Sequence, residues 1–285
     1  MAQYGLPYKG SKSKIAKWVI DILPSAQVLY DIFAGGCAIT HCALLSGKYD
    51  KVFANDISFS IDCFADAIAG KYKGYYPWVS HQEFDNYKRV DPAIALCYSF
   101  GNDGWTYAYG KDIEPYKRAM HEVICGESIQ QRRLAMKRFV RSLIALREGA
   151  VEHLERLQSL EHLERLQLLE HLERLQFGAI NCAFEYSRGD YRDVAFTGDD
   201  IVVYCDPPYK CTRKDYKFGD DNFNREEFYD WCCAQTAPLY ISEYAMPEDR
   251  FVCIAQREVA CSMSVTKRGK AIEKIFRPKH QVNGK

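Results

Sequence analysis

The stretch that most constrains this chain is residues 201–209, IVVYCDPPY. Its first five residues are β-branched, aromatic or small and apolar, which predicts a short buried strand. The strand must end at Asp206, because the two prolines that follow lack an N–H and fix φ. Asp-Pro alone is common in simple turns, but the full motif adds a carboxylate, rigid carbonyls and a ring where α/β sheets bind ligands. This set favours a flat substrate with an amino group, and it predicts a catalytic site made of Asp206, Pro207, Pro208 and Tyr209.

Two further buried strands are predicted near the start of the chain, at 28–33 and 51–54. The first runs into a glycine turn at 34–37, followed by an apolar helix over about 39–45. Glycines between a strand and a helix let the backbone approach a ligand closely. Asp56, after the second strand, is placed to accept hydrogen bonds from ribose hydroxyls. The glycine pattern that binds pyrophosphates, G-x-G-x-x-G, is incomplete here because Cys37 and Thr40 interrupt it. We therefore expect a nucleoside ligand without a pyrophosphate.

The alternation of strands and helices disappears from about 72 to 150, where aromatic, glycine-rich loops precede a helix predicted over 128–147. This helix has no acidic residue between 132 and 147. Cations four residues apart share one helical face, which predicts a nucleic-acid surface; an ordinary solvated face is the alternative. The cations on that face are Arg133, Lys137 and Arg141.

Residues 151–177 repeat one nine-residue unit: VEHLERLQS, LEHLERLQL, LEHLERLQF. Glu-to-Arg pairs at i,i+4 and the absence of Gly and Pro favour a helix. Leucine, however, recurs at every third position, and on an α-helix such a row turns by about 60° per step and gives no single buried stripe. A compact solenoid or irregular coil is therefore slightly favoured. The three histidines recur with the unit, so we interpret them as part of the repeat and not as metal ligands.

The composition excludes several classes of protein. Lys+Arg and Asp+Glu are both 38, so net charge gives no sign of a nucleic-acid partner and only local patches do. No apolar run reaches the length of a membrane span, so we expect no membrane partner. The cysteines described next lead us to expect a cytoplasmic protein. The 12 cysteines include no C-x-x-C pair, which predicts reduced, buried thiols and no metal site.

The remaining predicted elements complete an α/β pattern. Strands are predicted at 181–186, 239–242, 251–255 and 271–276, and helices at 15–23 and 226–233. A cationic loop at 210–217 follows the strand at 201–205 and is placed to meet phosphates.

Taken in order, these motifs resemble the Dam-type family of S-adenosylmethionine-dependent DNA adenine methyltransferases, phage and prophage members above all. The resemblance covers Leu6 to about Arg277. The Y-x-G-[GS]-K element is Tyr8, Gly10, Ser11 and Lys12, with Pro7 where the family has lysine. The D-x-F-x-G-x-G motif is Asp31, Phe33 and Gly35, with Cys37 in place of the last glycine. The acid after the second strand is Asp56, the D-Y pair is Asp190 and Tyr191, and D-P-P-Y is residues 206–209.

The resemblance implies a Rossmann-like methyltransferase sheet built from 1–71 and 178–285, with a mainly helical target-recognition region at 72–150 and the repeat at 151–177 inserted. It implies S-adenosylmethionine as cofactor, double-stranded DNA as partner, no metal, and a monomer or weak dimer. The cofactor-binding residues would be Tyr8, Gly10, Lys12, Asp31, Phe33, Ala34, Gly35, Gly36, Cys37, Asp56, Asp190, Tyr191 and Asp206. The DNA-binding residues would be Lys9, Arg133, Lys137, Arg141, Lys210, Arg213 and Lys214.

The activity implied is site-specific methylation of adenine, which would be flipped out of the duplex so that its amino group is reached. Asp206 and the Pro207 carbonyl would accept the two N–H bonds, and Tyr209 would stack on the ring. Methylation of RNA adenine or of the exocyclic amine of DNA cytosine is the alternative within enzymes. A non-catalytic DNA-binding or scaffold protein, with the repeat as an oligomerisation element, is the alternative outside them.

Overall fold

The computed structural model describes residues 4–7, 10–111, 113–145, 161–175, 181–208, 223–260 and 270–282. The chain divides into two compact units. The first consists of residues 1–5, 12–61 and 179–285, and the second of residues 6–11 and 62–178. The strand at 201–205 and the glycine turn at 34–37 therefore belong to the first unit, and the basic helix and the repeat belong to the second.

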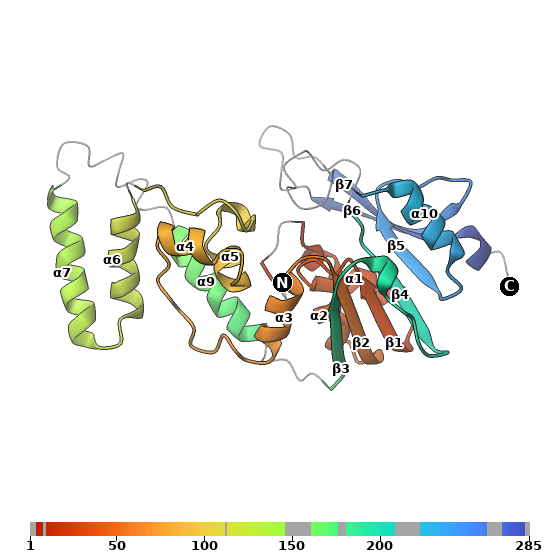
Figure 1. The fold of residues 1–285 in the computed structure, drawn as a ribbon, viewed down its shortest axis with the longest axis horizontal. Coiled ribbons are helices and arrows are strands. Elements are labelled where there is room, and N and C mark those ends of the chain that lie inside the picture. Colours follow the sequence, from red (N-terminus) through yellow and green to blue (C-terminus); the bar gives the residue numbers. More distant parts are fainter. Residues whose placement is uncertain are drawn as a thin grey trace. The chain divides into compact units, whose positions relative to one another are not determined.

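The first unit is built on a seven-stranded sheet with the order β3-β2-β1-β4-β5-β7-β6 (Figure 1). Neighbours from β3 to β5 pair in parallel, whereas β7 pairs antiparallel with both β5 and β6. This is a mixed α/β fold with a Rossmann-like sheet, and every strand predicted from the sequence is present. The strands are β1 (Ala26–Ile32), β2 (Tyr49–Asp56), β3 (Ala183–Arg188), β4 (Ile201–Cys205), β5 (Leu239–Glu243), β6 (Phe251–Ala260) and β7 (Lys270–Pro278).

Helices cover both faces of this sheet because side chains alternate along its strands. On one face, Phe228 and Cys232 of α10 (Arg225–Ala234) join a core with Ile32 and Val203. On the other face α2 (Ala38–Leu44) packs on β1 and β2, and α1 (Ala16–Ile22) packs on α2. The described part of the unit also contains the short 3₁₀ turns η1 (Lys12–Lys14), η4 (Tyr191–Asp193) and η5 (Lys279–Gln281).

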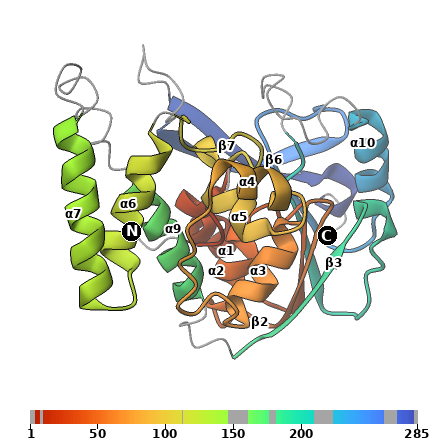
Figure 2. The ribbon, with the colours of Figure 1, turned by 60° about the vertical axis from the view of Figure 1, so that its left-hand side comes forward.

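The described residues of the second unit are mainly helical, and the helix predicted over 128–147 is present at Ile129–Ala145. Its helices are α4 (His81–Tyr87), α5 (Pro92–Cys97), α6 (Glu114–Cys125), α7 (Ile129–Ala145) and α9 (Glu161–Arg174), with the turn η2 (Phe100–Asn102). It also contains most of α3 (Ser60–Ile68), which begins in the first unit. Aromatic side chains from the loops form its core, where Trp78 and Tyr109 stack with ring centroids 6.1 Å apart. In two views α6 and α7 run side by side as a helical hairpin (Figures 1 and 2).

The expectation of a solenoid or irregular coil for the repeat is wrong over Glu161–Arg174, which form the continuous helix α9. Leu169 and Leu172 are fully buried, and the helix contacts both α5 and α6. A helix with leucines on several faces is stable here because it has partners on more than one side. The predicted i,i+4 pairing is confirmed at Glu170 and Arg174. Residues 151–160, 176 and 177 lie outside the described part of the chain.

Candidate active site

The carboxyl ends of β1, β2, β4 and β5 meet at one edge of the sheet. Their parallel pairing sets Ile32 beside both Asn55 and Cys205, and Cys205 beside Ile241. The residues that follow these strands therefore cluster, although they are far apart in sequence. This edge holds the glycine turn, Asp56, Asp206 and Glu243.

The glycine turn at 34–37 has a left-handed backbone at two residues, with φ of 51° at Gly35 and 58° at Cys37. Cys37 is also the N-cap residue of α2. The Gly35 N–H donates to Asp56 Oδ2 at 2.7 Å, and Ser60 Oγ donates to the Gly35 carbonyl at 2.7 Å. Asp56 therefore fixes the turn from the end of β2.

Asp56 keeps acceptor capacity for a ligand. Its second oxygen, Oδ1, accepts from the Ser58 N–H at 2.7 Å. A carboxylate has about four lone-pair sites, so hydrogen bonds from the backbone of Gly35, Ile57 and Ser58 leave one open. Burial raises the pKa of the Asp56 carboxyl, against the opposing effect of its backbone hydrogen bonds.

Asp31, which was predicted to bind the cofactor, is almost fully buried between β1 and α2. Its side chain is 1% exposed and accepts from the Thr40 N–H at 3.0 Å and the Thr40 hydroxyl at 2.5 Å. Burial raises the pKa of Asp31 to about 7. The Asp31 carboxyl thus connects β1 to α2. The glycine turn lies between these two elements in the chain, so we propose that Asp31 helps to hold it.

A neighbour of this turn that sequence reasoning missed is Gly5. Its φ is +69°, and a Cβ built on it would lie 2.4 Å from the Gly36 carbonyl oxygen. Its N–H donates to His41 Nδ1 on α2 at 3.1 Å. The backbone of the N-terminal segment therefore packs directly against the backbone of the glycine turn. A single glycine in a sequence is not enough to predict such a close approach.

Asp206 lies directly after β4 and is paired with a lysine from the N-terminal segment. Lys12 Nζ is 3.2 Å from Asp206 Oδ1 and 3.9 Å from Glu273 Oε2. Both members of the closer pair are largely buried. The Asp206 N–H donates to the Ile32 carbonyl at 3.3 Å, which ties the start of the turn to β1. The structure thus brings together two predicted site residues, Lys12 and Asp206, that are 194 positions apart by their numbers.

The turn continues to Pro208, whose carbonyl accepts from Arg225 Nη1 at 2.7 Å. The same Nη1 lies 3.7 Å from Glu243 Oε2 at the end of β5. Glu243 is 3% exposed, and burial raises its pKa to about 7. Neither Arg225 nor Glu243 was predicted. The one available signal was the acid ending an apolar strand at 239–242, the same pattern that identified Asp56 and Asp206.

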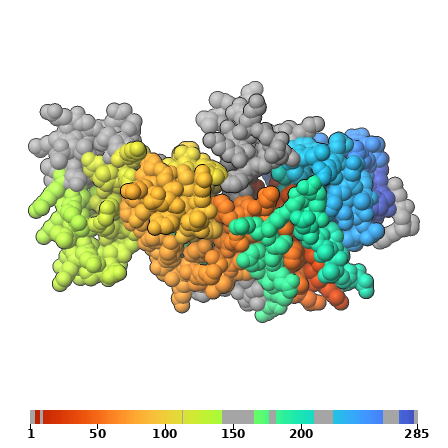
Figure 3. Space-filling model, in the orientation of Figure 1, coloured from red at the N-terminus to blue at the C-terminus, as the bar shows by residue number. Residues whose placement is uncertain are grey.

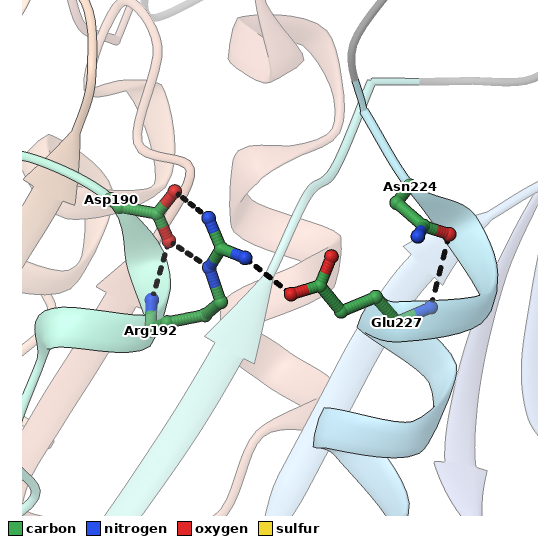
Figure 4. Close-up of polar contacts among 4 residues, drawn as sticks. All are labelled: Asp190, Arg192, Asn224 and Glu227. Carbon is green, nitrogen blue, oxygen red and sulfur yellow. Dashed lines mark hydrogen bonds and ion pairs between the residues drawn. The ribbon is translucent and has the colours of Figure 1, made fainter.

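Asp190 is held by an arginine fork. Arg192 donates to its two carboxylate oxygens from Nε and Nη2, each at 2.8 Å, and to Glu227 on α10 from Nη1 (Figure 4). Asn224 caps the same helix by accepting from the Glu227 N–H at 3.2 Å. The hydrogen bonds from Arg192 lower the pKa of Asp190.

Aromatic rings cluster beside Asp190, near the carboxyl ends of the strands. Phe33, which has a φ of 68°, lies 5.0 Å from Tyr191 and 5.7 Å from Phe223 between ring centroids. Phe33 and Tyr191 were both predicted as site residues, and the structure brings them into contact. Phe223 was not predicted.

The other predicted residues fall elsewhere. Gly10 belongs to the second unit, as do the exposed cations of α7, which are Arg133, Lys137 and Arg141. The rest lie outside the described residues: Tyr8, Lys9, Tyr209, Lys210, Arg213 and Lys214.

Two absences concern only the described part of the chain. There, no group of three or more His, Cys, Asp or Glu side chains is arranged to hold a metal ion. Among the helices it contains, none has the length and apolar character needed to cross a membrane.

Comparison with known proteins gives one family and several structural neighbours. Residues 8–149 match the model of the D12 class N6 adenine-specific DNA methyltransferases. No curated protein matches the chain. Among solved structures, the rRNA methyltransferase aviRa from Streptomyces viridochromogenes is 12% identical with a TM-score of 0.38, covering 95% of this chain and 86% of its own. A candidate RNA methyltransferase from Pyrococcus horikoshii is 12% identical with a TM-score of 0.37, covering 95% of this chain and 85% of its own.

Proposed function

Because this chain belongs, through residues 8–149, to the D12 class N6 adenine-specific DNA methyltransferase family, we propose that it methylates the exocyclic amino group of an adenine flipped out of double-stranded DNA, with S-adenosylmethionine as methyl donor. The observation that carries this proposal is the turn at 206–208. It sets the Asp206 carboxylate, paired with Lys12 at 3.2 Å, after β4 at the edge that also holds the glycine turn.

The residues at this edge fit S-adenosylmethionine. The turn at 34–37 follows β1 at this edge, where its glycines let a methionine chain pass close to the backbone, and Asp56 ends β2 where ribose hydroxyls would be met. Phe33 and Tyr191 offer an apolar, aromatic wall next to Asp190, which suits an adenine ring. When bound, the cofactor supplies a methyl group on a sulfonium, which is already a good leaving group. Positioning and electrostatics from the protein are then the main contributions to rate.

We assign the substrate amine to Asp206 and the Pro207 carbonyl. The Pro208 carbonyl already accepts a hydrogen bond from Arg225 at 2.7 Å. We therefore assign the amine to the Pro207 carbonyl instead. Two N–H bonds to these acceptors draw the nitrogen lone pair out of conjugation with the ring and aim it at the methyl group. Lys12 fixes the Asp206 carboxylate from its other side. Tyr209 is proposed to stack on the flipped base.

We propose that two groups of cations contact DNA: those on α7 and those near the proposed site in the sequence. Arg133, Lys137 and Arg141 form an exposed, acid-free face on α7 that suits phosphates. The same role is proposed for Lys9, Lys210, Arg213 and Lys214. We also propose that the protein acts in the cytoplasm as a monomer or weak dimer.

The test is to incubate the chain with methyl-labelled S-adenosylmethionine and, separately, double-stranded DNA or RNA, and then to identify the labelled nucleoside. We expect N6-methyl-2′-deoxyadenosine from the DNA. Label only in RNA supports the RNA alternative, and label on cytosine supports the cytosine alternative. DNA binding without transfer supports the non-catalytic alternative. Each of these three results overturns our proposal.

Asp206→Ala tests the mechanism in the same assay. Without the carboxylate the amine is neither activated nor placed, so we expect turnover below about a tenth of wild type, a barrier higher by at least about 1.4 kcal/mol. Asp21→Ala is the control, because Asp21 is an exposed carboxylate on α1 that pairs with Lys17. More than a tenth of wild-type turnover in Asp206→Ala contradicts the mechanism.

A further inference from the structure

We propose that Arg225, in the first turn of α10, is a positioning residue that holds the turn at 206–208 in its working geometry. The inference rests on the proposed function and adds to it a residue that neither the family motifs nor the sequence patterns single out. Its direct basis is the hydrogen bond from Arg225 Nη1 to the Pro208 carbonyl, at 2.7 Å.

The composition of the turn explains why an outside donor is needed. Pro207 and Pro208 have no N–H, so they cannot fasten the turn through their own backbone donors. The N–H of Asp206 bonds to the Ile32 carbonyl at 3.3 Å and holds only the start of the turn. Among the described residues, Arg225 is the donor that holds the far end of the turn, through the Pro208 carbonyl. A shift of Pro208 would move the Pro207 carbonyl and the Asp206 carboxylate, which are the two groups assigned to the substrate amine.

Arg225 is itself held from several directions. Glu243, at the end of the buried strand β5, lies 3.7 Å from its Nη1 and is fastened in turn by the Tyr244 N–H, which donates to Oε1 at 2.8 Å. The guanidinium also lies over the Phe223 ring, 5.8 Å from its centroid. Because β5 pairs directly with β4, the carboxylate that orients Arg225 sits on the strand next to the one that presents the turn. A planar guanidinium held in this way loses little freedom when it donates its hydrogen bond.

The start of α10 has a second anchor on its outer side. Glu227 accepts from Arg192, whose other two donors hold Asp190, and Asn224 caps the helix (Figure 4). The first turn of α10 is therefore tied to the proposed adenine side through Glu227 and to the proposed catalytic turn through Arg225. This double attachment gives Arg225 a fixed origin from which to hold Pro208.

The test compares Arg225→Gln with a matched control, Arg250→Gln, whose carboxylate partners lie on α10. Arg250 pairs with Glu226 at 2.5 Å and Asp230 at 2.9 Å on the outer surface of α10, so Arg250→Gln removes one cation and two ion pairs without touching the turn. For Arg225→Gln we expect the single-turnover methylation rate to fall about 100-fold, the scale of a 1 Å misplacement. Affinities for S-adenosylmethionine and DNA should stay near wild type. For Arg250→Gln we expect a rate within about twofold of wild type, because exposed ion pairs contribute little.

Two further variants separate positioning from simple neutralisation of Glu243. If Arg225 serves only to balance that buried carboxylate, the double variant Arg225→Gln, Glu243→Gln should regain the wild-type rate. Positioning predicts that the double variant stays slow while its thermal stability recovers. Arg225→Lys, which keeps a donor on a point charge, should recover part of the rate. If Arg225→Gln alone fails to fold, the double variant carries the same test.

The outcomes distinguish this inference from the proposed function. A wild-type chain that transfers no methyl group overturns both. An active wild type with Arg225→Gln at a similar rate overturns the inference alone. So does a double variant at the wild-type rate, or a rate loss in Arg225→Gln that is explained by lost cofactor affinity.

Discussion

Single residues around the glycine turn adopt a backbone that most residues avoid. Phe33 and Cys37 have φ of 68° and 58°, although neither is glycine. Such conformations cost about 1–3 kcal/mol each and cluster at functional sites, where the surrounding structure enforces them. Here the enforcing contacts are Asp31 to Thr40, Asp56 to Gly35, and Gly5 to the turn itself. The strain supports the assignment of this turn to cofactor binding.

The close approach of Gly5 gives a prediction at this scale. Gly5→Ala and Gly47→Ala place a Cβ at nearly the same φ, +69° and +67°, but only the first meets atoms within 4 Å. Both variants bear the left-handed cost of about 1 kcal/mol. Gly5→Ala must also displace Gly36, so we expect a larger loss of unfolding free energy in urea and weaker S-adenosylmethionine binding. Equal losses in the two variants, with binding unchanged in both, would show that the approach to Gly36 is unimportant.

At the scale of whole elements, the cations of α7 fall into two groups with different surroundings. Arg132 donates to the Gly126 carbonyl at 2.6 Å and Arg138 pairs with Glu122 at 3.0 Å, so these two fasten the α6–α7 hairpin. The cations at 133, 137 and 141 are exposed instead. Side chains of α7 are visible on the surface in Figure 3. Because the helix has no acidic residue, its exposed face is a source of positive potential in a chain of zero net charge.

The triple variant Arg133→Gln, Lys137→Gln, Arg141→Gln tests that face. We expect weaker DNA binding, and a plot of log K against log salt that is less steep by up to about 2.7, since each phosphate contact contributes about 0.9. Cofactor affinity should not change. The control replaces Lys17, Arg118 and Arg174 by Gln, which removes equal charge from cations already paired at i,i+4 with Asp21, Glu122 and Glu170. Parallel salt dependences for wild type and the α7 variant would rule out phosphate contacts by this helix.

For the molecule as a whole, buried carboxyls link stability to pH. Burial raises the pKa of Asp31 and of Glu243 to about 7, and also raises the pKa of Asp56. Between the unfolded value near 4 and about 7, the folded chain therefore holds protons that the unfolded chain has lost. Stability should fall as pH rises through this window. The pKa of Asp190 is lowered, so its contribution is lost only at lower pH, as that carboxylate becomes protonated.

We accordingly expect the unfolding free energy to decrease from about pH 5 to pH 7.5, by up to about 1.4 kcal/mol per pH unit for each carboxyl that stays protonated in the fold. Urea unfolding at several pH values measures this slope. Asp31→Asn and Glu243→Gln should each make it shallower, because each removes one titrating group. A slope of the opposite sign would show that other groups govern the pH dependence.

Local sequence patterns predicted the strands, the basic helix and the two acids at the strand ends, Asp56 and Asp206. Runs such as 201–205, the glycine turn at 34–37 and the acids at Asp56 and Asp206 are local patterns, since strand alternation, turn chemistry and helical spacing act over a few residues. For the same reason the pairing of Glu170 with Arg174 was predictable.

Which of these residues lie in contact depends on the tertiary structure. The sheet order places β7 between β5 and β6, and the pairing of β5 with β4 makes Glu243 a neighbour of the turn through Arg225. The conformation of 161–174 followed the same logic, because contacts with α5 and α6 made a helix stable where the leucine spacing alone disfavoured one. Contacts between distant segments depend on strand pairing and on the partners that packing supplies, and neither leaves a mark within a short stretch of sequence.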